Sequence, residues 1–242
     1  MTRILLEVCI DDTQGFAAAR AGGADRLELC AALGLGGLTP SPALVAEAAR
    51  VGMPAMAMIR PRPGDYVWTE PEVAQMENEI ALLRAVGLRG VVIGASLPDG
   101  RLDAAILARL MQASQGLDVT LNRVSDLAPD GEAVVALALE LGIPRILSSG
   151  GAPGAPDGVE RLARMFRAAA GRLTIMPGAG LSAETLPAIA GLPLAEVHGS
   201  FSSPAPEPAP LVAAFGFQPP GTRRTDAGKV AAMRAALERM GR

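Results

Sequence analysis

The chain alternates strand-like and helix-like segments along almost its whole length, and this alternation constrains its fold more than any other feature. Apolar runs predict strands near residues 4–9, 26–30, 54–60, 90–95, 117–122, 144–149, 172–177 and 194–199. Helical spacing predicts helices between them, near 13–22, 40–51, 71–86, 103–115, 131–141, 157–170 and 182–191. Because the unit recurs at roughly 22 to 35 residues, we predict an α/β fold, a (β/α)8 TIM barrel.

Capping residues agree with this division. Signals for helix starts precede four of the predicted helices, at Asp12-Thr13, Thr39-Pro40-Ser41-Pro42, Thr69-Glu70-Pro71-Glu72 and Ser182 with Thr185. Glycines that are typical of helix ends precede the next strand at Gly22-Gly23, Gly52, Gly87, Gly116, Gly142, Gly171 and Gly191. These glycines occupy equivalent places in successive units, which supports the repeat.

We predict a single domain over residues 1–242, since α/β barrels of this length form one domain. Half of the residues are hydrophobic, and only one Trp, one Tyr and five Phe are present, so the core must be aliphatic. The repeat breaks at residues 201–225, a Pro-rich segment that we expect to wrap the barrel rim. A last helix, at 226–240, places Val230, Met233, Ala236, Leu237 and Met240 on one face, which predicts packing against the barrel, with a dimer contact as the alternative.

Charge and cysteine content exclude several classes of function. A net charge of −3 without a basic stripe argues against nucleic-acid and membrane partners. The chain starts without a signal peptide and contains no apolar run of membrane-spanning length, so we expect a cytoplasmic protein. In a reducing compartment its two cysteines are not expected to form a structural disulfide, which leaves buried filler, metal ligand or reactive thiol.

Three short runs share one pattern, in which an acid and an apolar residue precede a side chain that can bind metal or act as a base. They are Glu7-Val8-Cys9, Glu28-Leu29-Cys30 and Glu196-Val197-His198. Side chains alternate along a strand, so the acid and the third residue share one face. The apolar residues must face the surrounding helices, where an unpaired carboxylate would be costly. The acids therefore face the barrel interior, which is polar at its mouth.

The predicted catalytic residues are the three acids and the only histidine of the chain: Glu7, Glu28, Glu196 and His198. They come from the eighth, first and second strands, which are neighbours in a closed barrel. Shear places inward side chains of adjacent strands in different layers, so this adjacency permits a shared site without requiring one. Interior carboxylates and arginines could equally form an ion-pair network without catalysis.

Two kinds of metal site are compatible with these residues. Cys9, Cys30 and His198 form a soft set that suits Cu(I) or Zn(II). The three carboxylates form a hard set that suits Mg(II) or Mn(II), or they could pair with Arg60 and Arg123 without metal. Buried filler remains the alternative for both cysteines, and a hydrogen-bonded rim histidine the alternative for His198.

Further polar residues and glycines follow the other strands. Because barrel sites form at the C-terminal ends of strands, we predict that they bind substrate. They are Arg60, Arg62, Asp65, Asn122, Arg123, Asp126, Ser149, Gly178 and Gly180. The glycines after the seventh strand could present backbone amides to an anion, although such a pattern can also be a simple turn.

Several of these runs resemble the CutC family, and the resemblance covers nearly the whole chain apart from residues 201–225. They are Leu6-Glu7-Val8-Cys9, the stretch from Gly23 to Cys30 continuing to Gly36-Gly37-Leu38-Thr39-Pro40-Ser41, Ile59 to Tyr66, Leu147-Ser148-Ser149-Gly150 and Glu196-Val197-His198. The resemblance implies a cytoplasmic TIM barrel, often a homo-oligomer, with a part in copper homeostasis. It also implies that Cys9 and Cys30 are the Cu(I) ligands.

One departure affects the mechanism. Where the family usually has His-Arg-Ala-Phe-Asp, this chain has Asn122-Arg123-Val124-Ser125-Asp126. An amide is not a general base and is a poor ligand for a soft metal, so His198 is the only imidazole available.

Three functions remain open on the sequence. The first is a copper homeostasis protein that binds Cu(I) at the barrel mouth, with His198 or Met58 near the cysteines. The second is an enzyme that acts on a small anionic or phosphorylated substrate by acid–base chemistry, with Arg60 and Arg123 clamping the anion. The third is an assembly or regulatory partner that buries Tyr66, Trp68 and the Pro-rich segment in a dimer.

Overall fold

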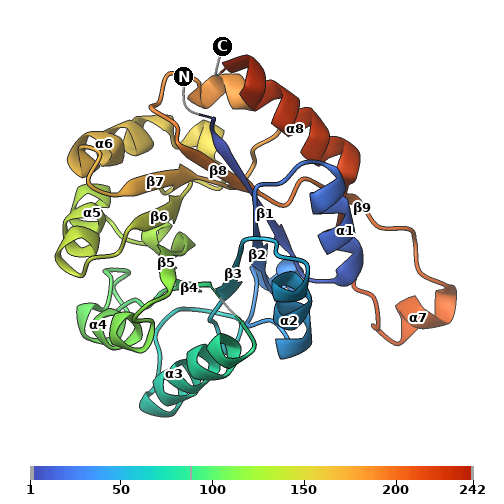
Figure 1. The fold of residues 1–242 in the computed structure, drawn as a ribbon, viewed down its shortest axis with the longest axis horizontal. Helices are drawn as coiled ribbons and strands as arrows, with labels where there is room; N and C mark the ends of the chain where they lie inside the picture. The colour runs from blue at the N-terminus through green and yellow to red at the C-terminus, as the bar shows by residue number, and fades with distance from the viewer. Residues whose placement is uncertain (1–2, 88, 241–242) are drawn as a thin grey trace.

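Eight parallel strands form a nearly closed barrel in this computed structural model, which describes residues 3–87 and 89–240. The strands are β1 Leu5–Ile10, β2 Arg26–Leu29, β3 Ala55–Met58, β4 Gly90–Ile93, β5 Asp118–Leu121, β6 Arg145–Ser148, β7 Thr174–Pro177 and β8 Glu196–Gly199. Their order is β7-β6-β5-β4-β3-β2-β1-β8. Figure 1 looks along the barrel and shows the helices as a surrounding ring. The predicted TIM barrel is confirmed.

Six of the seven helices predicted between strands are present. They are α1 Thr13–Ala21, α2 Pro42–Arg50, α3 Glu70–Ala85, α4 Ala104–Ala113, α5 Gly131–Glu140 and α6 Val159–Ala169. The prediction at 182–191 was wrong, because only a short 3₁₀ helix forms there, at Leu186–Ile189. The Thr185 hydroxyl accepts a hydrogen bond from the backbone N of Ser182 at 2.9 Å, and Pro187 has no backbone N–H to continue a helix.

Three of the four predicted helix starts form caps, at Asp12, Ser41 and Thr69, whereas the helix predicted after Ser182 does not form. Oδ1 of Asp12 accepts a hydrogen bond from the N of Gly15 at 2.6 Å, and Oε2 of Glu72 accepts one from the N of Thr69 at 2.7 Å. At Gly22 the helices approach closely, since a Cβ there would lie 2.4 Å from Cβ of Val230. This contact seats the last helix, α8 Ala227–Met240, beside α1.

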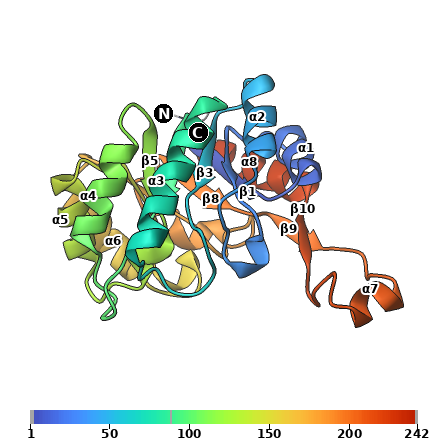
Figure 2. The ribbon, with the colours of Figure 1, turned by 90° about the horizontal axis from the view of Figure 1, so that it is seen from below.

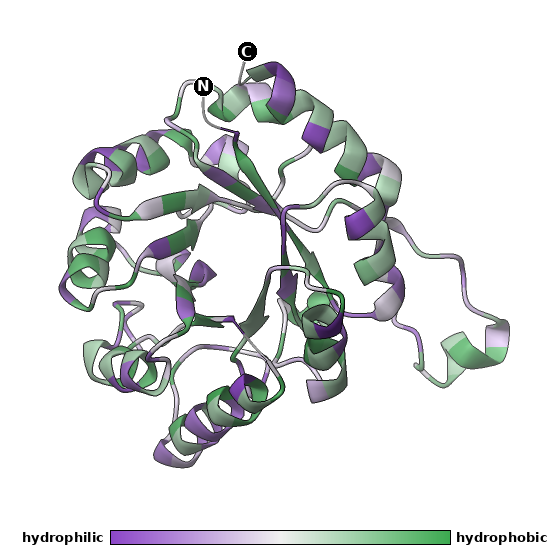
Figure 3. Ribbon diagram, viewed as in Figure 1, coloured by the Kyte–Doolittle hydropathy of each residue, from purple (hydrophilic) through white to green (hydrophobic). Residues whose placement is uncertain are grey.

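The barrel separates two apolar regions. The larger lies between strands and helices and contains Leu6, Val8, Leu27, Leu29 and Val197. The smaller lies inside the barrel and is formed by Cys30, Met56, Met58 and Val92. Figure 3 shows hydrophobic and hydrophilic residues intermixed along the strands, as expected from side chains that alternate between these two sides.

Helix α8 packs as predicted. Val230, Met233, Ala236 and Leu237 are buried, and Met240 is partly buried against the same core. Its predicted packing role is therefore confirmed. No helix in the described part of the chain is long and apolar enough to cross a membrane.

The Pro-rich segment differs from its prediction. Strands β9 Ser202–Pro204 and β10 Arg223–Thr225 pair antiparallel, and the chain between them, residues 205–222, contains the short helix α7 Pro210–Ala214. We call residues 205–222 the arm. It projects away from the barrel instead of wrapping the rim (Figure 2), because the β9–β10 pairing holds its two ends together and directs the chain outward.

Candidate functional site

A cavity of about 1140 Å³ opens at the C-terminal ends of the strands. Side chains from inside the barrel reach it, namely Cys9, Glu28, Met58, Asn122, Leu147 and His198. Its other walls come from residues 32–36, 179–184 and 199–202, from the base of the arm at 219–222, from Arg223 of β10 and from Lys229 of α8. The cavity therefore lies where barrel enzymes place their sites.

His198 is held by a buried carboxylate. In the β1–β8 pairing Glu7 lies directly opposite His198, and Nδ1 of His198 is 2.9 Å from Oε1 of Glu7. Arg26 donates to the other oxygen of Glu7 through Nε. Burial alone would raise the pKa of Glu7, but the His198 hydrogen bond and the Arg26 charge outweigh it and lower this pKa to about 2.

Cys9, Glu28 and His198 form a compact group. Cys9 lies opposite Glu28 in the β1–β2 pairing, and one ligand atom from each of the three residues lies within 4.8 Å of the others. Nε2 of His198 is 3.7 Å from Oε2 of Glu28. Oε1 of Glu28 is buried and has no hydrogen-bond partner among the described residues. An additional positive or hydrogen-donating group would therefore fit beside it.

Burial dominates the pKa of Cys9 and Glu28, whereas neighbouring groups dominate the pKa of His198. It raises the pKa of both the Cys9 thiol and the Glu28 carboxyl, and the charge of His198 offsets this only in part. Burial opposes the charged form of His198, but the Glu28 charge, Cys9 and the hydrogen bond to Glu7 raise its pKa well above the ordinary value. The histidine is thus held by acids on two sides.

Cys30 lies behind Glu28, among the apolar residues Met56, Met58 and Val92. Its Sγ is 3.6 Å from Oε2 of Glu28, and burial followed by the Glu28 charge raises the pKa of this thiol well above its usual value. The predicted metal ligands were Cys9, Cys30 and His198. The structure brings Cys9 and His198 together with Glu28, and Cys30 is not part of this compact group.

Glu196 belongs to a different cluster, nearer the N-terminal ends of the strands. It lies opposite Leu5 in the β1–β8 pairing and accepts hydrogen bonds from Arg26 and, at 2.7 Å, from Arg145 Nε. Arg145 also donates to Asp118 at 3.0 Å. The three acids all face the interior as predicted, but the barrel stagger separates Glu196 from the cavity that Glu28 lines.

Arg26 and Arg145 were missed as site residues. Arg26 precedes Glu28 by two positions and Arg145 precedes Leu147 by two, so the same alternation that selected the acids would have placed both arginines inside the barrel. They balance the interior carboxylates, and Arg26 connects Glu7 with Glu196.

Arg60 and its neighbours organise loops. The Arg60 guanidinium donates to the backbone oxygens of Leu35, Gly37 and Gly64 and lies 4.8 Å from the Tyr66 ring centre. Arg62 pairs with Asp65 at 3.0 Å and with Glu72, and it stacks on Trp68. Arg60, Arg62 and Asp65, all predicted to bind substrate, thus order the β2–α2 and β3–α3 connections.

Asp126 forms a second loop-ordering centre. It accepts hydrogen bonds from Ser148, from the backbone N of Ser149 and Gly151, and from Arg123 Nε at 2.8 Å. The Ser149 hydroxyl bonds to Asp126 and to the oxygen of Ala152. Burial would raise the pKa of Asp126, but these hydrogen bonds outweigh it and lower the pKa. Arg123 also lines the cavity.

Three further residues that were predicted to bind substrate, Asn122, Gly178 and Gly180, lie at or beside the cavity. Asn122 is buried, and its side-chain oxygen accepts from the N of Val124 at 2.9 Å. Gly178 lies against the side chains of Leu147 and His198. A larger residue would not fit there, since its Cβ would lie 2.5 Å from Cδ1 of Leu147 and 3.2 Å from Cβ of His198. Gly180 lines the cavity with a φ of +68°, which favours glycine.

The family model for the CutC family matches residues 4–203. The chain belongs to the CutC family. It is 50% identical over 239 residues to a CutC family protein from Rhizobium meliloti (strain 1021), a match that covers 98% of each chain. The resemblance inferred from the sequence motifs is thereby confirmed.

Comparison with solved structures supports the fold and, in the first case, the family. The structure of a CutC protein from Streptococcus agalactiae, which is named for copper homeostasis, is 27% identical, with a TM-score of 0.77, and the match covers 81% of this chain and 98% of that one. Thiamine phosphate pyrophosphorylase from Pyrococcus furiosus is 11% identical, with a TM-score of 0.60 and coverage of 98% and 96%. The second likeness concerns the fold alone. The site has an amide at Asn122 and a single imidazole, that of His198, the only histidine in the chain.

Proposed function

We propose that this protein acts in copper homeostasis in the cytoplasm by binding Cu(I) at the floor of the mouth cavity. The observation that carries the proposal is the group formed by Cys9, Glu28 and His198, whose ligand atoms lie within 4.8 Å of one another. Membership of the CutC family, and the name of the Streptococcus agalactiae protein, support copper as the metal.

The donor set fits a soft ion. A thiolate and an imidazole suit Cu(I), and both belong to residues that line the cavity. The unpartnered Oε1 of Glu28 would lie beside a bound cation, which would relieve a buried polar group that now has no partner. Copper would be the cargo of the protein, supplied and removed through the open mouth.

Each residue has a distinct part in this proposal. Cys9 Sγ and His198 would bind the ion, and Glu7 would hold the imidazole through Nδ1 so that Nε2 stays directed toward Glu28. Glu28 would balance charge. Cys30, 3.6 Å from Glu28, would act as a second sulfur ligand after a side-chain rearrangement, and Met58 of the cavity would supply a thioether.

A competition titration tests the proposal. The reduced protein is titrated with Cu(I) against a chromophoric Cu(I) chelator, alongside Cys9→Ser, Cys30→Ser and His198→Asn. We expect one ion per chain and a loss of at least about tenfold in affinity for the Cys9 and His198 variants. A smaller loss is expected for Cys30→Ser. Unchanged affinity in a Cys9→Ser, Cys30→Ser double variant would exclude this site.

A second candidate is an enzyme that acts on a small molecule by acid–base chemistry. The cavity of about 1140 Å³ favours it, because this is far more room than one ion needs. Glu28, with its raised pKa, would donate a proton, and His198, whose raised pKa keeps the ring protonated, would orient the substrate through a charged N–H. The structure argues against the prediction that Arg60 and Arg123 clamp an anionic substrate. Arg60 donates to three backbone oxygens, and Arg123 pairs with Asp126.

Crystals soaked with inorganic phosphate test this second candidate. Phosphate bound between Arg123 and the backbone at Gly180 would support an anionic substrate, since both line the cavity. A cavity that contains only solvent, with Arg123 still bound to Asp126, would argue against it.

We also propose that the protein is a homo-oligomer and that the arm takes part in the contact. Leu211, Phe215 and Phe217 of the arm are 71%, 68% and 78% exposed, and the two phenylalanine rings stack with centres 5.7 Å apart. Figure 3 shows hydrophobic residues on α7, which projects from the barrel. A second copy of the chain would cover this apolar surface.

A further inference from the structure

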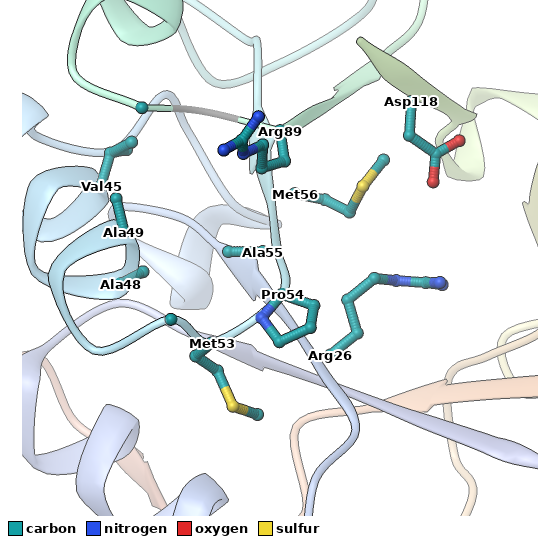
Figure 4. A pocket seen from close by; sticks show the side chains of 12 residues that line it. Arg26, Val45, Ala48, Ala49, Met53, Pro54, Ala55, Met56, Arg89 and Asp118 are labelled. Atoms are coloured by element: carbon teal, nitrogen blue, oxygen red, sulfur yellow. The ribbon is translucent and has the colours of Figure 1, made fainter.

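A small cavity of about 440 Å³ lies at the opposite end of the barrel from the mouth (Figure 4). Two arginines line it, but they are directed apart. Arg26 reaches into the barrel, where it pairs with Glu7 and Glu196, and Arg89 lies toward α2. Positive charges that meet each other are found instead at the rim of the mouth cavity.

Two cations meet at this rim. Nη2 of Arg223 donates a hydrogen bond to the backbone oxygen of Ser202 at 2.5 Å, and Nζ of Lys229 donates one to the same oxygen at 2.9 Å. Arg223 belongs to β10 and Lys229 to the first turn of α8, and both line the mouth cavity. Because both donors bind one oxygen atom, the guanidinium and the ammonium are close neighbours.

Both cations keep donors that the protein does not use. Arg223 gives Nε and Nη2 to Ser202, so Nη1 has no partner among residues 3–87 and 89–240. Lys229 uses one of its three N–H groups for Ser202, which leaves two. Both side chains are exposed, so a ligand in the cavity can reach these donors.

Two hydroxyls of the cavity wall lie beside the cations. Oγ of Ser202 accepts a hydrogen bond from Nε of Arg223 at 2.9 Å and lies 3.2 Å from Oγ of Ser200. Only one of the two hydroxyls can donate across that contact, so the other keeps its proton for a further acceptor. The rim therefore offers a guanidinium, an ammonium and a hydroxyl at one place.

Two acids lie close enough to interact with the charge of Lys229, namely Glu184 of the cavity wall and Asp226 before α8. Neither forms an ion pair with Arg223 or Lys229 in the described part of the chain. The Asp226 carboxylate accepts hydrogen bonds from backbone N–H groups in the first turn of α8, which offset its charge. Glu184 is exposed, so water and salt screen it.

The rim is close in sequence to the cavity floor. Ser200 follows His198 by two positions, so their Cα atoms lie at most about 7 Å apart. A group bound beside Ser200 thus leaves only a short distance to the imidazole. A ligand that reaches from the rim to the floor would need a short carbon chain.

We propose that Ser200, Ser202, Arg223 and Lys229 bind the phosphate of a small phosphate monoester whose organic part extends into the mouth cavity. Such a phosphate carries about −1.5 to −2 charges at pH 7 and has three acceptor oxygens, which match two cations and a hydroxyl. A monocarboxylate has one charge and would be held less strongly. The inference rests on the second candidate function, because it names the charged group of that small molecule.

Glycerol 3-phosphate is the probe that tests the proposal. Calorimetric titration of the reduced, metal-free protein compares it with inorganic phosphate, glycerate and glycerol. We expect saturable binding of glycerol 3-phosphate at one site per chain, at least about tenfold tighter than that of glycerate or glycerol. Inorganic phosphate should compete for the same site with lower affinity. Equal affinity for glycerate, or tighter binding of inorganic phosphate than of the ester, would overturn the proposal.

Three variants locate the phosphate. Lys229→Gln and Arg223→Gln each remove a charge-assisted hydrogen bond and should weaken glycerol 3-phosphate binding about tenfold. Arg224→Gln is the matched control, since Arg224 is the next residue of β10, is exposed and donates to Gln14 outside the cavity. It should leave binding within about twofold. Retained affinity in both Lys229→Gln and Arg223→Gln, or an equal loss in Arg224→Gln, would contradict the assignment.

Phosphorus NMR separates the rim site from the acid–base function. Glu28→Gln removes the proposed proton donor at the cavity floor and should leave glycerol 3-phosphate affinity within about threefold of the parent. Small phosphate esters that bind in a Lys229-dependent manner without being converted would support the rim site and contradict the acid–base function. Conversion of an uncharged compound, with no binding of any phosphate ester, would support the function and overturn the rim site.

Discussion

Nδ1 of His198 lies 2.9 Å from Oε1 of Glu7, across the paired strands β1 and β8. This contact fixes the ring of the only histidine in the chain from inside the barrel. It also joins the mouth to the interior ion pairs, because Arg26 donates to the other oxygen of Glu7 and to Glu196. Glu7 therefore serves both the stability of the barrel and the geometry of the site.

Glu7→Gln should lower both stability and Cu(I) affinity. The free energy of unfolding should fall by about 3 kcal/mol, since the buried Arg26 loses a charged partner. The affinity for Cu(I) should fall about tenfold, because a hydrogen bond that orients a metal-binding histidine is weakened. Denaturant unfolding and the chelator competition measure the two effects.

Glu196→Gln is the matched control. It removes a charge that pairs with Arg26 and Arg145, so stability should also fall, but Cu(I) affinity should stay within about twofold of the parent. A loss of affinity as large as that of Glu7→Gln would mean that general destabilisation, and not the histidine contact, controls binding.

Gly178→Ala should destabilise the barrel by about 2 kcal/mol through overpacking. The added Cβ would lie 2.5 Å from Cδ1 of Leu147 and 3.2 Å from Cβ of His198, so both side chains must shift. Gly191→Ala is the control, because a Cβ there would meet no atom within 4 Å. Equal unfolding midpoints for the two variants in urea would contradict the close packing of Gly178 against Leu147 and His198.

Asp126→Asn should cost about 2 kcal/mol at pH 7, because the largely buried Asp126 carboxylate accepts several hydrogen bonds. The folded pKa of Asp126 is lowered from 3.8, so its contribution is fully present above pH 3.8 and is lost as the pH falls through the lower folded value. Unfolding of both proteins between pH 7 and pH 2.5 should show the gap shrinking in acid. A gap that stayed constant would rule out this role for the charge.

Phe215→Ser with Phe217→Ser should weaken self-association, since both rings are exposed on the arm. Sedimentation velocity should show a parent oligomer and a lighter species for the double variant, with unchanged circular dichroism. Leu82→Ser is the control, because Leu82 is similarly exposed, at 63%, but lies on α3. If the parent sediments as a monomer, the arm has no such role.

The repeat predicted the barrel well because each strand and helix carries its own local signal. Alternation also predicted that Glu7, Glu28 and Glu196 face inward, and burial of Leu6 and Val197 on the helix side agrees. Alternation could not assign each acid to a layer of the barrel interior, because the stagger between strands depends on pairing across the whole barrel. The sequence therefore predicts Glu196 in one catalytic group with Glu28 and His198 at the barrel mouth, whereas the structure pairs it with Arg26 and Arg145.

The arginines show the other limit of sequence reasoning. Arg60, Arg62 and Arg123 follow strands, as substrate-binding residues of barrels do. In the structure Arg62 and Arg123 pair with acids three positions further along the chain, and Arg60 donates to backbone oxygens, including that of Leu35 in another loop. No local pattern distinguishes a loop-ordering arginine from an anion-binding one, since an arginine near an acid in a loop is compatible with both. The arm was likewise unforeseen, because the β9–β10 pairing joins residues about twenty positions apart.

X-ray absorption at the copper edge, on protein loaded with one equivalent of Cu(I), tests the central claim most directly. The account predicts sulfur and imidazole scattering, with the sulfur contribution reduced in Cys9→Ser and the imidazole contribution lost in His198→Asn. A spectrum that is identical in the parent and both variants would contradict copper binding at the floor of this cavity.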